Sequence, residues 1–126
     1  MSDVFDWNDF ATLAEELSRR DNEASLRTAI SRIYYSTYHK AKDYLVEEGV
    51  PLSTSDSSHK VVWNGYKNFG RSCRSVGING DRLFDNRKKA DYDKEVEDIK
   101  KLLNESFMIA EKILVYLEQC KLSRAT

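Results

Sequence analysis

Residues 23–48 read EASLRTAISRIYYSTYHKAKDYLVEE, a run without proline or glycine whose apolar side chains recur at helical spacing. At about 100° per residue, seven further side chains fall within about 60° of Ile30 and share its face: Leu26, Ile33, Tyr34, Thr37, Ala41, Tyr44 and Leu45. Gly49 follows at a helix stop position, with Pro51 shortly after it. The stretch therefore predicts one long helix with a single core-facing side.

The same helix carries Arg32, Tyr35 and His39 at about 140° to 200° from Ile30, on the side away from that core. Arg32 and His39 lie on one line of the helix, with Tyr35 between them. Core packing does not explain a cation, a phenol and an imidazole in one row. An exposed face without a role, a contact with another subunit and a catalytic site are three interpretations of this row.

The flanking sequence predicts further helices. We expect one over about 7–20, capped by Asp6 or Asn8, and a shorter one over about 59–69, closed by Gly70. A last helix is expected over about 93–119, because its apolar side chains recur at spacings of three, four or seven: Val96, Ile99, Leu103, Ala110, Ile113 and Leu117.

Residues 71–81 are expected to form an irregular, mobile connection. They contain Gly77 and Gly80, and Asn79 with Gly80 makes a dipeptide typical of turns. One or two helical turns are expected to follow over 82–90.

Length and composition bound the fold class. The chain has 126 residues, 40% hydrophobic and 33% charged, with a single proline. That length fits one domain, and the scarcity of short alternating apolar runs argues against a β-sandwich. The sequence therefore predicts an all-α domain over residues 1–126, an antiparallel four-helix bundle with an additional short helix.

The sequence also bears on the compartment. No apolar run approaches the roughly 18 residues that cross a bilayer. The N-terminus, MSDVFDWNDF, is acidic and aromatic, unlike a signal peptide. Cys73 and Cys120 lie far apart and form neither a disulfide framework nor a zinc pattern. We therefore expect a cytoplasmic protein with reduced cysteines and no membrane association.

The net charge of −1 excludes a polycation that would bind nucleic acid by its overall charge. Residues 67–89, however, hold seven basic and two acidic side chains. The segment is either a solvated loop or a local patch for a polyanion. As candidate nucleic-acid-binding residues we take Tyr35, Arg71, Arg74, Lys88 and Lys89.

Three segments carry a resemblance to a known family: RIYYSTYHKAKDYL (32–45), SHKVVW (58–63) and LFDNRKKADYD (83–93). Together they resemble the HEPN superfamily (higher eukaryotes and prokaryotes nucleotide-binding domain), in particular its small prokaryotic branch with YYxxYH and RxxADY signatures. The resemblance runs from about residue 27 to 117. It implies a helical bundle, frequent dimerisation and, in many members, RNA cleavage without a metal.

The family's nuclease signature is an arginine and a histidine separated by four to six residues, which Arg32-x6-His39 matches. In many active members this motif opens the last long helix. At that place in this chain Arg87 stands where the arginine would be, and Tyr92 stands in place of the histidine. The resemblance thus makes Arg32, His39, Arg87 and Tyr92 the candidate catalytic residues.

The chemistry fits these residue types. A histidine titrates near neutrality and can accept the 2′-hydroxyl proton, and an arginine can stabilise charge on the phosphorane. Tyr35 or Tyr92 could orient a phosphate or protonate the leaving group. No carboxylate cluster has metal-ligand spacing, so we expect neither a metal nor a cofactor.

Other acidic and imidazole side chains are interpreted as structural. Asp91 and Asp93 are expected to be helix-start residues, and His59 is expected to cap or pack the third helix. The template for a phosphate-binding loop fails because the glycine-rich stretch GINGD (77–81) lacks the required lysine and spacing. No G-x-S-x-G nucleophile elbow occurs in the sequence.

Three functions follow as hypotheses. The first is a toxin-like ribonuclease whose Arg32 and His39 converge from two chains of a homodimer. The second is a module that binds a nucleotide or RNA without cleavage, or pairs with a separate nucleotidyltransferase. The third is a structural dimerisation domain. A homodimer through the helix over 23–48 is expected, because Tyr35, Tyr38 and Val46 leave apolar surface there.

Overall fold

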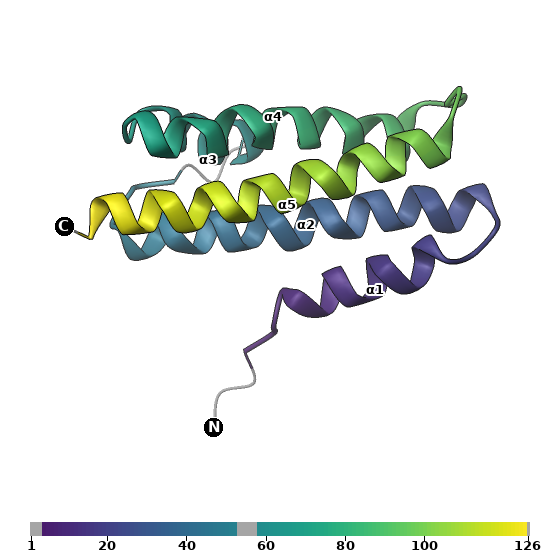
Figure 1. Cartoon of the computed structure of the whole chain (residues 1–126), viewed down its shortest axis with the longest axis horizontal. Helices are drawn as coiled ribbons and strands as arrows, with labels where there is room; N and C mark the ends of the chain where they lie inside the picture. The colour runs from purple at the N-terminus through teal and green to yellow at the C-terminus, as the bar shows by residue number, and fades with distance from the viewer. Residues whose placement is uncertain (1–3, 53–57, 126) are drawn as a thin grey trace.

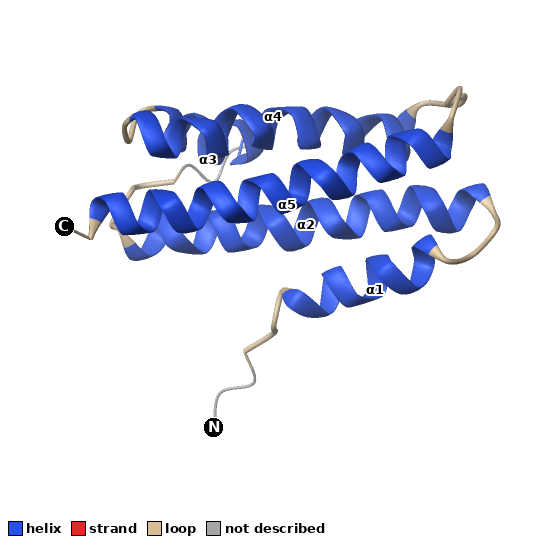
Figure 2. Ribbon diagram, in the orientation of Figure 1, coloured by secondary structure: helices blue, strands red, loops and turns tan. Residues whose placement is uncertain are grey.

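The computed structural model describes residues 4–52 and 58–125, and five α-helices lie within them (Figures 1 and 2). They are α1 (Asn8–Ser18), α2 (Glu23–Glu47), α3 (Ser58–Lys67), α4 (Arg71–Tyr92) and α5 (Ile99–Arg124). No strand occurs in this part of the chain, so the predicted all-α bundle is confirmed. None of these described helices combines the length and apolarity needed to cross a membrane.

The helices α1 and α2 run in opposite directions, and so do α4 and α5. The two longest helices, α2 and α5, run in the same direction. Figure 1 shows α1 doubling back into α2, and α4 doubling back into α5. The helices α2 and α5 lie side by side and are joined at both ends. Lys100 is 3.5 Å from Asp21 where they begin, and Arg124 is 3.1 Å from Glu48 where they end. The helix α4 between them runs the opposite way and so permits this parallel arrangement, and the short helix α3 packs on α4 (Figure 1).

The helix boundaries at α1 and α2 have local causes. The Asn22 side chain caps α2 by accepting a hydrogen bond from the Ser25 amide, 2.8 Å away. The Asp6 carboxylate accepts from the Asn8 amide at 2.9 Å where α1 begins. Gly49, with φ of +77°, ends α2 in the left-handed conformation that favours glycine. These ends agree with the prediction to within two residues.

The expectation of a mobile connection over 71–81 is wrong, because α4 is a single helix of 22 residues. Its glycines do not make a turn; they let two helices approach closely. A Cβ atom at Gly77 would lie 2.3 Å from the Trp63 carbonyl oxygen, and one at Gly80 would lie 2.1 Å from the Trp63 ring. The close packing of α3 outweighs the helix penalty of about 1 kcal/mol per glycine.

The last helix begins at Ile99 rather than at Asp93. Asp98 caps it, because its carboxylate accepts a hydrogen bond from the Lys101 amide at 3.1 Å. The interpretation of Asp91 and Asp93 as helix-start residues is therefore wrong. Asp91 lies in the last turn of α4, and Asp93 is the residue that ends it.

The predicted core is formed largely as expected. The side chains on the Ile30 face of α2 are buried, except that Tyr44 is only partly so. On α5, Leu103, Ala110, Ile113 and Leu117 are buried too. The helices α2 and α5 therefore share one apolar core.

The expectation of reduced cysteines is also wrong for this structure. Cys73 at the start of α4 and Cys120 near the end of α5 form a disulfide, and both are buried. The two cysteines are 47 residues apart in sequence, but their Cα atoms lie only 4.7 Å apart. The antiparallel pairing of α4 and α5 brings the two cysteines together.

Candidate functional site

The row of Arg32, Tyr35 and His39 does not face away from the protein, as the helical angles alone predicted. Each side chain is partly buried. The N-terminal part of α1 covers the row: the Trp7 ring stacks on His39, with centroids 3.7 Å apart and planes at 10°. The Arg32 guanidinium lies 4.8 Å from the centre of the Phe10 ring. Packing by α1 thus accounts for part of this unusual row.

The ring of Tyr35 is the point where the two predicted signatures meet. The guanidinium carbon of Arg32 lies 5.2 Å from its centre, and that of Arg87, from α4, lies 5.5 Å from it. The His39 ring stacks at 6.1 Å and the His59 ring lies at 5.9 Å. We call this region the arginine face and define it by Arg32, Tyr35 and His39 of α2, His59 of α3, and Arg87 and Asp91 of α4.

Arg87 is the most buried cation of the arginine face, with 7% of its surface exposed. Its guanidinium lies 5.2 Å from the centre of the Phe84 ring and within 5.8 Å of those of Tyr34, Tyr35 and Tyr92. The negative faces of such rings stabilise a cation removed from water. The Nε atom of Arg87 has no hydrogen-bond partner among the described residues. The side chain therefore retains an unused donor.

A polar chain links the two arginines. Nη1 of Arg87 donates to Oδ2 of Asp91 at 3.3 Å. The Ser31 hydroxyl donates to the same oxygen at 3.4 Å, and Arg32 Nη2 donates to that hydroxyl at 3.3 Å. One carboxylate thus holds cationic side chains from two helices in one region. Sequence reasoning missed the link between Ser31 and Asp91 because the two residues are 60 positions apart in the chain.

His59 packs inside the face rather than capping a helix. Its ring stacks on Phe84, with centroids 4.9 Å apart, and its Nδ1 lies 2.7 Å from the Tyr34 hydroxyl. That hydroxyl accepts from the Trp63 indole at 3.2 Å, so its own proton is available for Nδ1. This arrangement favours the neutral imidazole with its hydrogen on Nε2. Of the two roles left open for His59, the structure favours packing.

Both histidines are held towards their neutral forms. Burial lowers the pKa of His59 to about 4, and the positive charges of Arg87, His39 and Lys42 act in the same direction. Burial also lowers the pKa of His39; Lys42 adds to this effect and Asp43 opposes it. A neutral imidazole at physiological pH is the form that accepts a proton.

The remaining candidates on α4 fall into two groups. Arg71 and Arg74 are exposed in its first turn, and Lys88 and Lys89 are exposed near its end, about 25 Å further along the helix. Lys88 reaches the arginine face, since its Nζ lies 4.7 Å from the centre of the Phe84 ring. The basic segment is therefore two patches, of which only one adjoins the site.

Part of the positive charge of this segment is already paired. Lys67 bonds to Asp81, and Lys88 lies 3.4 Å from Asp85. Arg87 is paired as well, with Asp91 outside the segment, so three of the seven basic side chains of residues 67–89 already have an acidic partner.

Tyr92 closes α4 with 75% of its surface exposed, and Arg87 lies 5.8 Å from the centre of its ring. The residue that replaces the family histidine therefore lies beside the buried guanidinium. Its ring presents an open surface at the edge of the arginine face. A ligand can stack on the Tyr92 ring without displacing the side chains of other described residues.

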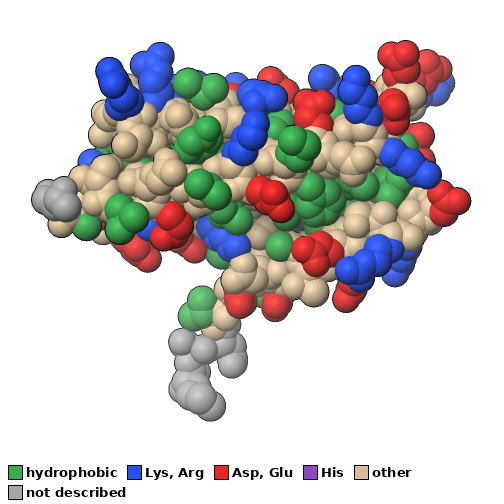
Figure 3. Space-filling model, viewed as in Figure 1, with side chains coloured by type: hydrophobic (Ala, Val, Ile, Leu, Met, Phe, Trp, Pro, Cys, Tyr) green, Lys and Arg blue, Asp and Glu red, His purple; other side chains and the backbone are tan. Residues whose placement is uncertain are grey.

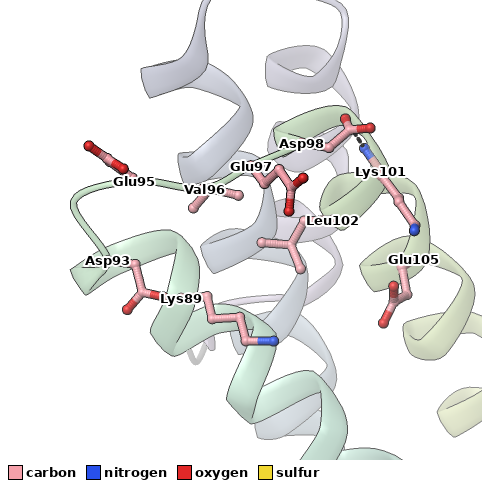
Figure 4. A pocket seen from close by; sticks show the side chains of 9 residues that line it. All are labelled: Lys89, Asp93, Glu95, Val96, Glu97, Asp98, Lys101, Leu102 and Glu105. Atoms are coloured by element: carbon pink, nitrogen blue, oxygen red, sulfur yellow. Dashed lines mark hydrogen bonds between the residues drawn. The ribbon is translucent and has the colours of Figure 1, made fainter.

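A surface hollow of about 610 Å³ lies at the junction of α4 and α5 (Figure 4). Five acidic side chains line it against two lysines, Lys101 and the predicted site residue Lys89. Such a lining repels phosphates. Across residues 4–52 and 58–125, no group of three or more His, Cys, Asp or Glu side chains has metal-binding geometry. The hollow is therefore not the candidate site.

Sequence reasoning missed the cover that α1 provides. The signal was present as aromatic residues at Phe5, Trp7 and Phe10, which contact one another with centroids 5.0–5.7 Å apart. Such clustering near a chain end indicates a packed segment rather than a free one.

Compared with models of known protein families, with curated proteins and with solved structures, the chain matches none.

Proposed function

We propose that the arginine face binds a phosphodiester of RNA and cleaves it without a metal, as the resemblance to the HEPN superfamily implies. One observation carries this proposal: Arg32 and His39 from α2 and Arg87 from α4 gather around one ring, Tyr35. Two cations and a neutral imidazole within one side chain's reach are the groups that such a reaction needs.

The residues take distinct roles in the proposed reaction. His39 accepts the proton of the 2′-hydroxyl as that oxygen attacks phosphorus. Arg32 and Arg87 stabilise the negative charge that builds up on the phosphorane. The bond to the 5′-oxygen then breaks, leaving a 2′,3′-cyclic phosphate, and Tyr35 or Tyr92 supplies a proton to the leaving oxygen.

The test is RNA cleavage in the presence of a chelator. His39→Ala should lower the rate by about 100- to 10,000-fold, the range typical of a lost general acid–base. Arg32→Ala should reduce it strongly as well, with helicity unchanged. Arg20→Ala serves as the control, because it removes an exposed arginine outside the arginine face. Equal rates for wild type and His39→Ala would exclude this role for the histidine.

A second function, binding of RNA or a nucleotide without cleavage, is favoured by the burial of Arg87 and the exposure of Tyr92. An open ring beside a cation suits base stacking. Such a module would act alone or beside a separate nucleotidyltransferase, as in a toxin–antitoxin pair. RNA binding by wild type with no chelator-resistant cleavage would favour this function over the first.

Binding should also distinguish the two basic patches. Replacing Lys88 and Lys89 with alanine should weaken RNA binding and reduce its salt dependence. With fewer phosphate contacts, fewer counterions are released when the RNA binds. Replacing Arg71 and Arg74 should have a smaller effect, because they lie at the other end of α4. Equal effects of the two pairs would indicate binding along the whole helix.

A further inference from the structure

His59 belongs to the arginine face, yet the proposed reaction gives it no role. Its imidazole lies between two rings: it stacks on Phe84 with centroids 4.9 Å apart, and the centre of the Tyr38 ring is 4.4 Å away. Tyr38 is only 4% exposed, so the apolar surface that the sequence predicts for it on α2 is not open. The two rings fix the plane of the imidazole.

A chain of hydrogen bonds fixes which nitrogen of His59 carries the hydrogen. The Trp63 indole donates to the Tyr34 hydroxyl at 3.2 Å, and that hydroxyl donates to Nδ1 of His59 at 2.7 Å. Trp63 and Tyr34 are fully buried, and an indole nitrogen can only donate, so the direction of the chain is set. The hydrogen of the neutral imidazole therefore lies on Nε2.

The Nε2 atom of His59 is an unpartnered donor that is open to solvent. Within residues 4–52 and 58–125, no group accepts a hydrogen bond from it. The buried side-chain atom that lacks a partner in this part of the chain is Nε of Arg87, so Nε2 of His59 is not buried. His59 thus offers a hydrogen bond to a ligand without losing one to the protein.

His59 lies in the same aromatic cluster as Arg87. Both side chains contact the rings of Tyr34, Tyr35 and Phe84, at 5.6, 5.9 and 4.9 Å for the imidazole and at 5.6, 5.5 and 5.2 Å for the guanidinium. After burial, the charge of Arg87 is the largest cause of the lowered pKa of His59. A cation that attracts an anion and a free N–H group are therefore found together.

We infer that His59 binds a phosphate oxygen of the RNA through its Nε2–H group, beside Arg87. This role rests on the proposed function, whose phosphate site it extends by one residue. An ionised phosphate oxygen accepts hydrogen bonds but donates none, which matches a nitrogen held as a donor. Arg87 supplies charge, and His59 supplies a directed hydrogen bond that strengthens as negative charge builds up on the phosphorane.

The two histidines thus have opposite roles, since His39 accepts a proton and His59 donates a hydrogen bond. Burial lowers the pKa of His59 to about 4, so the ring is neutral at pH 7 and keeps its single hydrogen. Figure 3 shows the side of the molecule where α5 lies, and neither histidine is visible there. RNA that contacts His59 must approach from another side.

Two substitutions at His59 separate the hydrogen bond from the packing of the ring. His59→Gln keeps an acceptor for the Tyr34 hydroxyl and an N–H donor for the ligand, but it has no ring. His59→Phe keeps a ring between Phe84 and Tyr38, but it has no N–H group. A donor role predicts that the glutamine variant retains more function, whereas a packing role predicts the reverse order.

Binding is measured with a 2′-O-methyl RNA oligonucleotide, which carries phosphates but lacks the hydroxyl that attacks phosphorus. His59→Phe should bind it about 10- to 100-fold more weakly than wild type, and His59→Gln should stay close to wild type. With unmodified RNA, His59→Phe should lower the cleavage rate by about 100- to 1,000-fold. Asn64→Ala, which changes an exposed side chain on the same helix, is the control and should match wild type in both assays.

NMR of the imidazole nitrogens in the full-length wild type tests the contact without RNA. Nδ1 of His59 should show the chemical shift of a nitrogen without hydrogen, and the Nε2–H signal should move when inorganic phosphate is added. Tyr34→Phe removes the donor to Nδ1. It should let the hydrogen exchange between the two nitrogens and weaken phosphate binding.

The outcomes distinguish this role from the proposed cleavage. Wild type that binds but does not cleave RNA, with His59→Phe binding more weakly than His59→Gln, would refute cleavage and support the phosphate contact. Cleaving wild type whose Nε2–H signal ignores phosphate, or a folded His59→Phe variant that binds as wild type does, would overturn the role of His59 alone. If His59→Phe does not fold, the phosphate titration of wild type decides.

Discussion

The arginine face and the outer face of α5, which carries the exposed side chains of Met108, Val115 and Leu122, both lie outside the shared core, and they differ in what covers them. The arginine face contains the residue types that suggest an exposed functional row, yet Trp7, just before α1, and Phe10 of α1 pack over it. The outer face of α5 contains ordinary apolar residues, yet nothing in the described chain covers Met108 or Val115.

Residue type alone therefore does not distinguish an open surface from a closed one. On the arginine face, the aromatic rings and Asp91 supply partners for two guanidinium groups within the same chain. On α5 the apolar side chains have no such partners. The exposure of a side chain, as at Met108, is therefore the better guide to an open surface.

The disulfide connects α4, which contributes Arg87 to the arginine face, with α5, which carries the outer face. Reducing it should change the free energy of unfolding more than any other change considered below. Closing a loop with a separation of 47 residues contributes about 4 kcal/mol in the chain-entropy account. Reduction should therefore lower the free energy of unfolding by about that amount. Denaturant unfolding with and without reductant measures it.

The control for this experiment is the double variant Cys73→Ser with Cys120→Ser, which should not respond to reductant. The two sulfur atoms are bonded to each other, so a thiol count should find none in protein denatured without reductant and two after denaturation with reductant. Two reactive thiols in protein denatured without reductant would contradict the bond.

A smaller effect, confined to the arginine face, is expected at Gly80. A Cβ atom there would lie 2.1 Å from the Trp63 ring, which is fully buried and donates to the Tyr34 hydroxyl. Gly80→Ala should destabilise the protein by about 1–3 kcal/mol, although alanine normally favours a helix. Denaturant unfolding gives the value.

Gly65 provides the matched control on α3. A Cβ atom at Gly65 would contact the flexible Leu45 side chain, at 3.1 Å to its Cδ1. Gly65→Ala should therefore be neutral or slightly stabilising. Equal stability of the two variants would mean that α3 and α4 are not packed as closely as described.

The fold could be predicted as far as it depends on local spacing. The apolar periodicity of α2 and the stop at Gly49 are properties of neighbouring residues, and both were predicted correctly. Gly77 and Gly80 look like turn residues from their neighbours alone. Their role depends on Trp63, which is more than a dozen residues away, so the helix α4 was missed.

The site shows the same limit. The alignment of Arg32 with His39 follows from one helix and was predicted. That Arg87 joins them around Tyr35 depends on how α4 packs on α2, and the sequence left this possibility open. The cover by Trp7 and the link through Asp91 depend on contacts between distant segments, and neither was predicted.

Trp7→Ala tests the cover over the arginine face. The lost ring contacts should reduce stability by about 0.5–1.5 kcal/mol. Because burial is the main cause of the lowered pKa of His39, the variant should move that pKa up towards its usual value. Titration of the imidazole by NMR measures the shift.

His59 is the internal reference in that titration. Its ring contacts Phe84 and Tyr38 rather than Trp7, and the charge of His39 affects its pKa less than burial does, so its pKa should change less than that of His39 and should not rise. Movement of both pKa values together would indicate general loosening of the bundle, whereas an unchanged His39 would show that Trp7 is not its cover.

The smallest effect expected is the contribution of His59 to the pH dependence of stability. Its pKa is about 4 in the folded protein and 6.5 when exposed, so between these values the unfolded chain binds the extra proton. The contribution of the neutral imidazole is thus fully present above pH 6.5 and is lost as the pH falls through about 4. The ring is only partly buried and water screens it, so we expect a change below about 1 kcal/mol. The variant His59→Gln tests this contribution, because its side chain keeps an acceptor for the Tyr34 hydroxyl but cannot titrate. Between pH 7 and 4, the wild-type protein should therefore lose more stability than the variant in denaturant unfolding. The carboxylates titrate alike in both proteins and do not contribute to the difference. Parallel curves would show that the imidazole is as hydrated in the folded protein as in the unfolded chain, and the arginine face would then be more open at α3 than its contacts indicate.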